Sequence, residues 1–380
     1  MNGRQKIEAS FSPNGTPEIP AVICYEDIYI RDHWHSLTTY PWWYAQSPDI
    51  DQQMAWMRAV IPAIRQDWMV LPTCPSRQDR ENLYIDPRKD GVYLTERLSG
   101  EKEQLRPPII GGWELFEHGY SGHVPYLAKT KAEVDRAVSL PSRFNRDHYI
   151  EAGHADLAQR LLAEFGNTRF AFDYASTPLW SCYSLWGFEG MMTMIADRPD
   201  LVQHACDRFL SAKLQSIQRA AALGADCIWI DDSLTDLISP RAFERLNLPY
   251  LQKMVAEVHA HGMHSIYYFC GNPVGKLNLL LESGAEALAL EESKKGFIID
   301  LAEIVEVVQG RCVLFGNLDA IHLLPHADEK TLRAEIRRQI NIGRRNLSRF
   351  IMSIGSPVTP GTSPEQVRKY CDLVHEEGSR

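Results

Sequence analysis

The strongest constraint on the fold is a strand-then-helix pattern that repeats from about residue 168 to the end of the chain. The apolar run 227–232 ends in Asp231-Asp232, and Ser239-Pro240 then predicts the start of a helix, with serine as its cap. Apolar runs return at 264–270, 287–292, 312–317 and 350–356, and an amphipathic stretch follows each of them. Such alternation predicts a parallel sheet that is covered by helices.

Two architectures fit that pattern, a barrel and an open doubly wound sheet. No Gly-x-Gly-x-x-Gly turn follows any of the strands, which counts against the open sheet. We therefore expect an α/β fold of the (β/α)₈ TIM-barrel class, as a single domain over residues 1–380. Residues 1–150 should supply the first barrel units, with a helix over 51–66 and a strand from Asp67 to Pro72. They should also carry an inserted β-hairpin over 84–94, because Asp90-Gly91 is a hairpin turn signal.

Composition and charge exclude several classes of protein. The net charge of −9 argues against a nucleic-acid partner, since such proteins present a basic face. No stretch approaches the roughly 20 apolar residues of a membrane-spanning helix. The eight cysteines are scattered, and several lie in apolar strand-like runs. We therefore expect reduced cysteines and a cytoplasmic protein that binds a small molecule.

Polar residues at the carboxyl ends of barrel strands are candidates for catalysis, because active sites of this fold lie at that face. Asp67 is a weaker candidate, since it begins its apolar run. Several carboxylates on one rim are typical of acid–base chemistry or cation binding, although single residues also cap helices or pair with Arg and Lys. The candidates at strand ends are Asp173, Asp231, Asp232, Cys270, Asn272, Glu291, Glu292, Asn317, Asp319 and Ser356.

Three neighbouring features remain open. Asp231-Asp232 is suited either to a cation or substrate ammonium, or to capping the next helix. Lys294-Lys295 either orients an anionic substrate or forms a solvated loop, and we expect the loop. Aromatic residues in the N-terminal part and around Trp180 and Tyr183 are suited to a substrate mouth, but we expect a hydrophobic lid or a dimer interface.

Several motifs together resemble the uroporphyrinogen decarboxylase superfamily. They are His259-Ala260-His261-Gly262, Tyr268-Phe269-Cys270-Gly271-Asn272, Phe315-Gly316-Asn317-Leu318-Asp319 and Pro360-Gly361-Thr362-Ser363-Pro364-Glu365. The resemblance covers residues 165–378 well and implies a (β/α)₈ barrel. It also implies one of two chemistries, decarboxylation without a cofactor or methyl transfer at zinc.

The decarboxylase branch implies an aspartate, a tyrosine and a late histidine, with an N-terminal arginine segment that binds carboxylates. Asp67 and Tyr183 match the first two positions, and Ser356 stands where the histidine would be. The arginine segment is missing, because Arg4-Gln5-Lys6 does not continue the motif.

The methyltransferase branch implies a His-x-Cys motif, a late cysteine and a glutamate as zinc ligands, since thiolate and imidazole suit Zn²⁺. Cys270 matches the first cysteine, and Glu291 or Glu292 matches the glutamate. Tyr268 replaces the histidine and Ser356 the late cysteine, so the metal site is altered.

The resemblance therefore implies a methyltransferase that demethylates a small substrate, with zinc or a cobalamin-type corrinoid on a partner protein. Alternatives are a cofactor-free decarboxylase and a non-catalytic binding barrel. Candidate residues fall into three groups: catalytic Asp67, Tyr183, Asp231, Asp232 and Ser356; substrate-binding Trp180, Tyr268, Asn272, Asn317 and Asp319; and metal-binding Cys270, Glu291 and Glu292.

Overall fold

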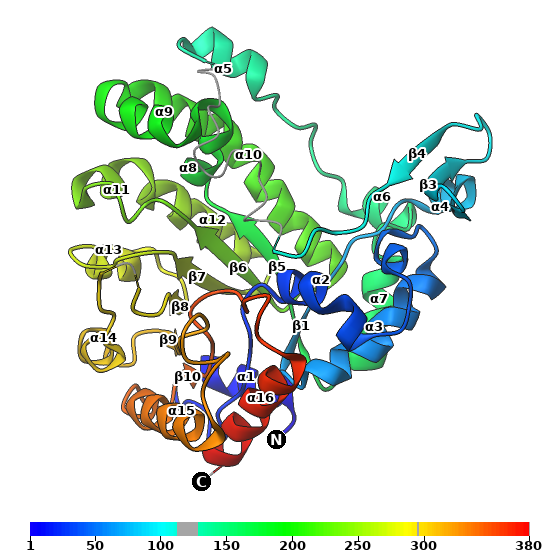
Figure 1. Ribbon diagram of the computed structural model, residues 1–380. Coiled ribbons are helices and arrows are strands. Elements are labelled where there is room, and N and C mark those ends of the chain that lie inside the picture. Colours follow the sequence, from blue (N-terminus) through cyan, green and yellow to red (C-terminus); the bar gives the residue numbers. More distant parts are fainter. Residues whose placement is uncertain (112–127, 295, 380) are drawn as a thin grey trace.

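Seven parallel strands form the main sheet of the protein, and the computed structural model describes residues 1–111, 128–294 and 296–379. Neighbours in the sheet follow the order β1-β5-β6-β7-β8-β9-β10. Figure 1 shows these strands as an arc with helices on its outer side. The strands are β1 Trp68–Val70, β5 Phe170–Ser176, β6 Cys227–Asp232, β7 His264–Phe269, β8 Ala287–Leu290, β9 Val313–Phe315 and β10 Phe350–Ile351.

An extended segment, residues 20–24, joins the two edges of this sheet. On one side the amide of Met352, just after β10, donates to the carbonyl of Pro20 (3.0 Å), and Ala21 forms a parallel bridge with Met352. On the other side the amide of Asp67, just before β1, donates to the carbonyl of Ala21 (2.8 Å). The eight strands expected from the sequence therefore correspond to seven assigned strands and one extended segment.

Aromatic side chains fill the space that the curled sheet encloses. The ring of Trp68 on β1 stacks on Phe172 on β5, with centroids 4.2 Å apart. It also meets Trp229 on β6 at 5.7 Å and Phe315 on β9 at 5.9 Å. Strands that are far apart in sheet order thus contact one another through their side chains, as is typical of a curled sheet of the TIM-barrel type.

Helices follow most strands and cover the outside of the sheet (Figure 1). The helix cap predicted at Ser239 is confirmed, since its side chain caps α11. Gly224 ends α10 in the left-handed conformation (φ 93°). Helices after β5 are α8 Pro178–Ser181, α9 Tyr183–Asp197, α10 Pro199–Leu223, α11 Pro240–Leu246, α12 Leu248–Ala260, α13 Leu277–Glu282, α14 Leu301–Val308, α15 Glu329–Arg344 and α16 Pro364–Gly378. Earlier helices are α1 Gly3–Phe11, α2 Glu26–Leu37, the 3₁₀ helix η1 Trp42–Gln46, α3 Ile50–Ile64, α4 Arg77–Asn82, α5 Lys131–Ala137, α6 Arg146–Glu151 and α7 Asp156–Phe165. None of these described helices is long and apolar enough to cross a bilayer.

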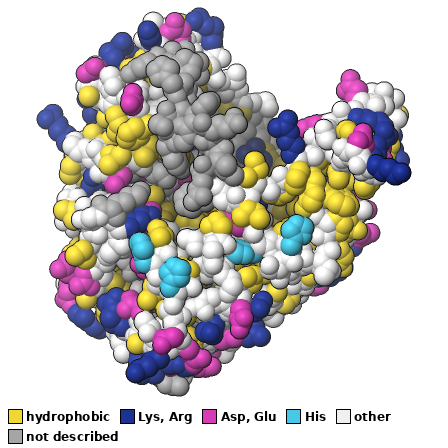
Figure 2. Space-filling view, in the orientation of Figure 1, with side chains coloured by type: hydrophobic (Ala, Val, Ile, Leu, Met, Phe, Trp, Pro, Cys, Tyr) yellow, Lys and Arg dark blue, Asp and Glu magenta, His cyan; other side chains and the backbone are white. Residues whose placement is uncertain are grey.

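A three-stranded antiparallel sheet lies apart from the main sheet. It comprises β2 Leu83–Arg88, β3 Gly91–Glu96 and β4 Lys102–Leu105, and Asp90-Gly91 lies at the turn where the sequence predicts a hairpin. Figure 1 shows this sheet projecting as an arm. In the same orientation, Figure 2 shows Lys and Arg side chains at the outer end of the arm and hydrophobic side chains where it joins the body.

Asp67 lies at the amino end of β1, where it ties together the two ends of the chain. Its carboxylate accepts from the Ala21 amide (2.7 Å) and pairs with His375 on α16 (2.8 Å), and Lys6 on α1 lies 3.8 Å away. Burial opposes ionisation, but His375 and Lys6 outweigh it and lower the pKa of Asp67. Asp67 thus lies at the end of β1 opposite to the strand-end face, and its catalytic role stays a prediction from the sequence.

We predict that Asp67→Asn destabilises the protein at pH 7 by about 3 kcal/mol, because Lys6 and His375 lose their buried counter-charge. A folded-state pKa below the unfolded value gives stability that is present above pH ~4 and is lost as the pH falls through the folded pKa. The variant should therefore differ most from the parent at pH 7 and least near pH ~2. Urea unfolding at both pH values measures this, with the exposed Asp147→Asn as the matched control. Equal stability of parent and Asp67→Asn at pH 7 would show that this carboxylate does not stabilise the contact between the two ends of the chain.

Candidate active site

A network of five polar side chains lies where β7, β8 and β10 end. Parallel pairing of β7, β8 and β9, and of β9 with β10, brings their carboxyl ends to one face. Cys270 directly follows β7, Glu291 and Glu292 directly follow β8, and Ser356 follows β10. We call the set of Cys270, Glu291, Glu292, Lys294 and Ser356 the rim network.

The thiol of Cys270 is hydrogen-bonded to a carboxylate. Its Sγ donates to Glu291 Oε1 at 3.0 Å. Of the eight cysteines, Cys270 is the one whose side chain is not buried. Burial, followed by the charge of Glu291, raises the pKa of the Cys270 thiol. The sulfur is therefore held as a protonated thiol at neutral pH, beside a group that accepts its proton.

Lys294 is the cation of the rim network. Its ammonium forms an ion pair with Glu291 and donates to Ser356 Oγ at 2.8 Å, and Ser356 in turn donates to Glu292 Oε2 at 2.8 Å. Burial alone would lower the pKa of Lys294, but the charges of Glu291 and Glu292 raise it. The solvated loop expected for Lys294 is therefore wrong, since its side chain is 12% exposed and fully engaged.

Two carboxylate oxygens of the network are buried and have no hydrogen-bond partner among the described residues. They are Glu291 Oε2 and Glu292 Oε1. Burial raises the pKa of Glu292, although Lys294 and Ser356 oppose that shift. Two carboxylates face one ammonium here, so the network either keeps a proton or carries one excess negative charge.

Gly355 sets how closely the end of β10 approaches the end of β8. A Cβ atom at this position would collide with the backbone amide and the carboxylate of Glu292. The carbonyl of Gly355 accepts a hydrogen bond from the hydroxyl of Tyr268 at 2.8 Å. Close backbone approach therefore places the Ser356 hydroxyl between Lys294 and Glu292.

Asp231 and Asp232 differ sharply although they are adjacent. Asp232 is fully buried and accepts hydrogen bonds from Thr177 (2.9 Å), Asn247 (2.6 Å) and Tyr267 (2.7 Å). These contacts point to a structural role for Asp232. Burial raises its pKa to about 6 despite the three donors.

The carboxyl group of Asp231 has fewer side-chain hydrogen-bond donors around it than that of Asp232. Burial, and then the charge of Asp232, raises its pKa to about 7. The charge of Lys213 favours the ionised form, but the Lys213 ammonium itself donates to Ser176 Oγ at 2.7 Å. The ring of Tyr25 also lies near this carboxylate. A carboxyl group at a strand end that titrates near neutral pH is suited to giving or taking a proton.

The donor groups do not fit the zinc site that the resemblance implies. Tyr268 stands at the expected histidine, and its ring stacks on Trp229 (5.1 Å) while its hydroxyl bonds to the backbone. Within the described residues, no three His, Cys, Asp or Glu side chains come together as metal ligands. The ammonium of Lys294 occupies the side of Glu291 that faces Cys270, since both contact Oε1.

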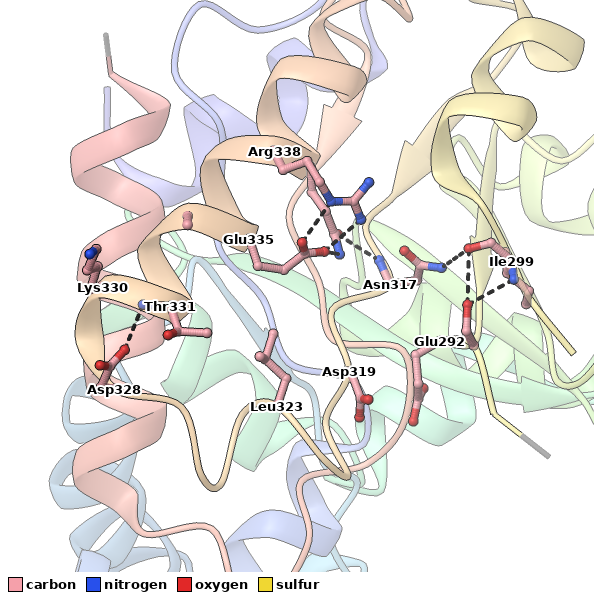
Figure 3. Close-up of a pocket in the computed structure, with 13 residues that line it drawn as sticks. Glu292, Ile299, Asn317, Asp319, Leu323, Asp328, Lys330, Thr331, Glu335 and Arg338 are labelled. Carbon is pink, nitrogen blue, oxygen red and sulfur yellow. Dashed lines mark hydrogen bonds and ion pairs between the residues drawn. The ribbon is translucent and has the colours of Figure 1, made fainter. Parts of the chain in front are cut away.

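Asn317 and Asp319 line a pocket of about 800 Å³ between the ends of β8 and β9 and helix α15. Asn317 donates to the carbonyl of Glu291 at 3.1 Å, so it supports the backbone of the rim network. Asp319 accepts from the amides of Ile321 and His322 and thus holds its own turn. Figure 3 shows Glu292 and Asp319 near each other in this pocket, with Glu335 and Arg338 projecting from α15 toward Asn317.

Four further candidates lie outside the rim network. Trp180 on α8 and Tyr183 on α9 pack against each other, with ring centroids 5.2 Å apart. Asn272 accepts from the amide of Val274 (3.1 Å) and so orders the loop after β7. Asp173, on β5, has a pKa that burial raises to about 6.

Sequence reasoning missed one residue beside the network and favoured the wrong alternative for another. Lys294 was expected in a solvated loop with Lys295, which lies outside the described residues, although its position three residues after Glu291 was a weak signal for an ion pair. Tyr25 has a left-handed backbone conformation (φ 52°) and packs on Tyr174 (5.7 Å) and Tyr268 (5.8 Å). No sequence pattern connected this residue, before α2, to strands far along the chain.

Comparison with known families and structures gives one family match and one close fold. A family model described as uroporphyrinogen decarboxylase (URO-D) matches residues 123–377. A solved methyltransferase from Methanosarcina mazei superposes with a TM-score of 0.66 and 18% identity, covering 99% of each chain. At this identity the superposition shows a shared fold.

Curated relatives named uroporphyrinogen decarboxylase match at low identity. The protein from Thermodesulfovibrio yellowstonii is 26% identical over 168 residues, which are 44% of this chain and 46% of the relative. The match to the protein from Burkholderia thailandensis is 24% identical and covers 82% of this chain and 90% of the relative. For the first relatives, the chain spans about half of their length.

We predict opposite effects of two adjacent substitutions on stability. Asp231→Asn removes a carboxylate whose ionisation the fold opposes, so at pH 8 the variant should be more stable than the parent by about 1 kcal/mol or more. A folded-state pKa of about 7, above the unfolded value, makes the parent lose stability as the pH rises toward 7, so the gain should be smaller at pH 5. Asp232→Asn, the control, should be destabilised by about 1–3 kcal/mol because its hydrogen-bond donors lose their acceptor. Denaturant unfolding measures both, and destabilisation by Asp231→Asn at pH 8 would contradict the assignment.

Proposed function

Because the chain belongs to the uroporphyrinogen decarboxylase family, we propose that it is an enzyme of the methyltransferase-like branch that removes a methyl group from a small substrate at the rim network. The observation that carries the proposal is the Cys270–Glu291 hydrogen bond at the carboxyl ends of the strands. A thiol and several carboxyl groups converge there. These groups are suited to transferring a proton when an alkyl group is removed from a substrate.

Proton transfer is the step that this chain's residues are suited to perform. When a methyl group leaves oxygen, nitrogen or sulfur, the bond to carbon breaks with its electrons on the heteroatom, which then takes up a proton. Asp231, with a pKa of about 7, is protonated in a large share of molecules at neutral pH and is the proposed donor. Cys270 and Glu291 would contact the substrate, and Asn317 would hold Glu291 in place.

The methyl acceptor is proposed to be supplied from outside the chain, as a thiol or as a corrinoid on a partner protein. A corrinoid supplies a nucleophilic metal centre that accepts a methyl group. Zinc has no role in the proposed reaction, because the donor groups of the rim network do not fit a zinc ion. Residues of this chain are proposed to bind the substrate and to deliver the proton to its heteroatom.

A cofactor-free decarboxylase is the second candidate, supported by the relatives' names and by the Burkholderia thailandensis match along most of both chains. The structure weakens its residue assignment, because Asp67 lies at the amino end of β1 and is engaged by Lys6 and His375. A decarboxylase would thus need another acid, and Asp231 is the best placed. The third candidate function is that of a non-catalytic barrel that binds a ligand.

We predict methyl transfer with a pH profile set by Asp231. The purified protein should demethylate a member of a panel of O-, N- or S-methylated compounds with reduced cobalamin or a thiol as acceptor. The rate should fall about tenfold per pH unit above 7, where Asp231 loses its proton. Asp231→Asn should be slower by about 10²-fold or more and lose this pH dependence, and Cys270→Ala should also be slower. The change in the cobalamin spectrum measures the rate.

Exposed Asp147→Asn, which lies far from the strand ends in sequence, is the matched control and should keep the parent profile. Release of CO₂ from a carboxylated pyrrole without methyl transfer would replace the proposal with the decarboxylase. Tight binding of a panel compound with neither reaction would leave the binding barrel.

A further inference from the structure

Lys294 lies beside the three side chains to which the resemblance assigns a metal ion. Cys270, Glu291 and Glu292 are of residue types that bind zinc and related divalent ions, but among the described residues they do not come together as a set of three ligands. Two of their oxygens, Glu291 Oε2 and Glu292 Oε1, are buried without a partner among the described residues. Both glutamates are less than one-twentieth exposed.

We propose that the Lys294 ammonium is the permanent cation of the rim network, held beside the residues to which the resemblance assigns a metal, and that its charge acts on the Cys270 thiol. The proposal concerns the site itself and stands whether or not the proposed methyl transfer does.

The contacts of Lys294 explain why a metal is disfavoured. Its ammonium pairs with Glu291 Oε1, the same oxygen that accepts from Cys270 Sγ. A metal bound between Cys270 and Glu291 would have to displace the ammonium from its ion pair. The displaced Lys294 would then remain largely buried without a counter-charge, which is strongly unfavourable. Because Lys294 is only three residues from Glu291 in the chain, its effective concentration at Glu291 is high, which favours it over a metal ion from solution.

Lys294 also spans two strand ends. Through Ser356 it reaches Glu292, so one ammonium compensates a carboxylate after β8 directly and a second one through a hydroxyl after β10. A serine fits this role, since its hydroxyl accepts from Lys294 and donates to Glu292 at the same time. The thiol that the resemblance places at position 356 is a weaker acceptor and donor. Ser356 and Lys294 thus form one matched pair.

The same charge acts on Cys270. Burial and Glu291 hold the thiol in its protonated form, whereas the charge of Lys294 and, to a smaller extent, a hydrogen bond with Ser233 favour the thiolate. Lys294 is therefore a positioning residue that acts on Cys270 through Glu291 and through its own charge. Removing the charge should make the thiolate harder to form, while an arginine should preserve it.

Cobalt titration tests the exclusion of metal. Co²⁺ bound to a thiolate gives a charge-transfer absorption band, so the metal alone is the probe. The parent protein should show no band that depends on Cys270, and Lys294→Met should gain one, removed again by Cys270→Ser. A Cys270-dependent band in the parent, at about one ion per chain, would overturn the proposal. The overturning result requires only the parent and a folded Cys270→Ser variant.

Alkylation of Cys270 tests the effect on the thiol. Iodoacetamide labelling of the peptide that contains Cys270 is followed by mass spectrometry from pH 7 to pH 10, with circular dichroism to check folding. Lys294→Met should shift the labelling profile to higher pH, with a rate at pH 8 reduced by about tenfold, and Lys294→Arg should restore it. An unchanged profile in folded Lys294→Met would contradict the role of the charge. Neither measurement depends on methyl transfer, so failure of the proposed function is distinguishable from failure here.

Discussion

The hydrogen bonds of residues 20–24 to both edges of the main sheet determine whether a strand-end face exists at all. Ala21 lies between Met352 after β10 and Asp67 before β1. Without this segment the sheet would keep two open edges, and the side chains after β8 and β10 would not be held at the separation that Lys294 bridges. Packing of Trp68, Trp229 and Phe315 inside the sheet supports the same closure.

Within that frame, charge balance defines the rim network more than any single residue does. Glu291 joins a neutral thiol to an ammonium, and Ser356 connects that ammonium to Glu292. Asp231 on β6 has a pKa near neutrality, because its carboxylate lacks the side-chain hydrogen-bond donors that surround Asp232 in the described structure. One face thus holds a paired, fixed set of charges and a second acid that changes its charge near neutrality.

The repeating pattern predicted the parallel sheet, the strand ends and the place of Cys270, Glu291, Glu292 and Ser356, because parallel strands bring equivalent ends together. It could not place Asp67, since an apolar run does not reveal which of its flanking residues faces the active rim. The burial of Lys294 could not be predicted, because a charged loop residue is buried only when partners from other strands surround it. Segment 20–24 was missed because its partners lie more than 40 residues away, just before β1, and some 330 residues away, after β10. Tyr25 was missed because its partners, Tyr174 and Tyr268, also lie far along the chain.

The carboxylate of Asp67 joins Lys6 near the start of the chain to His375 near its end. During synthesis, segment 20–24 and Asp67 leave the ribosome long before residue 352 and α16, so their contacts with these later residues form only after residues 352–378 have been made. Until then the aromatic interior of the sheet stays open to water, and the nascent chain exposes an apolar surface that promotes aggregation. Closure of the sheet is therefore a late step in folding, and a product truncated before α16 should be bound by chaperones instead of folding to a smaller domain.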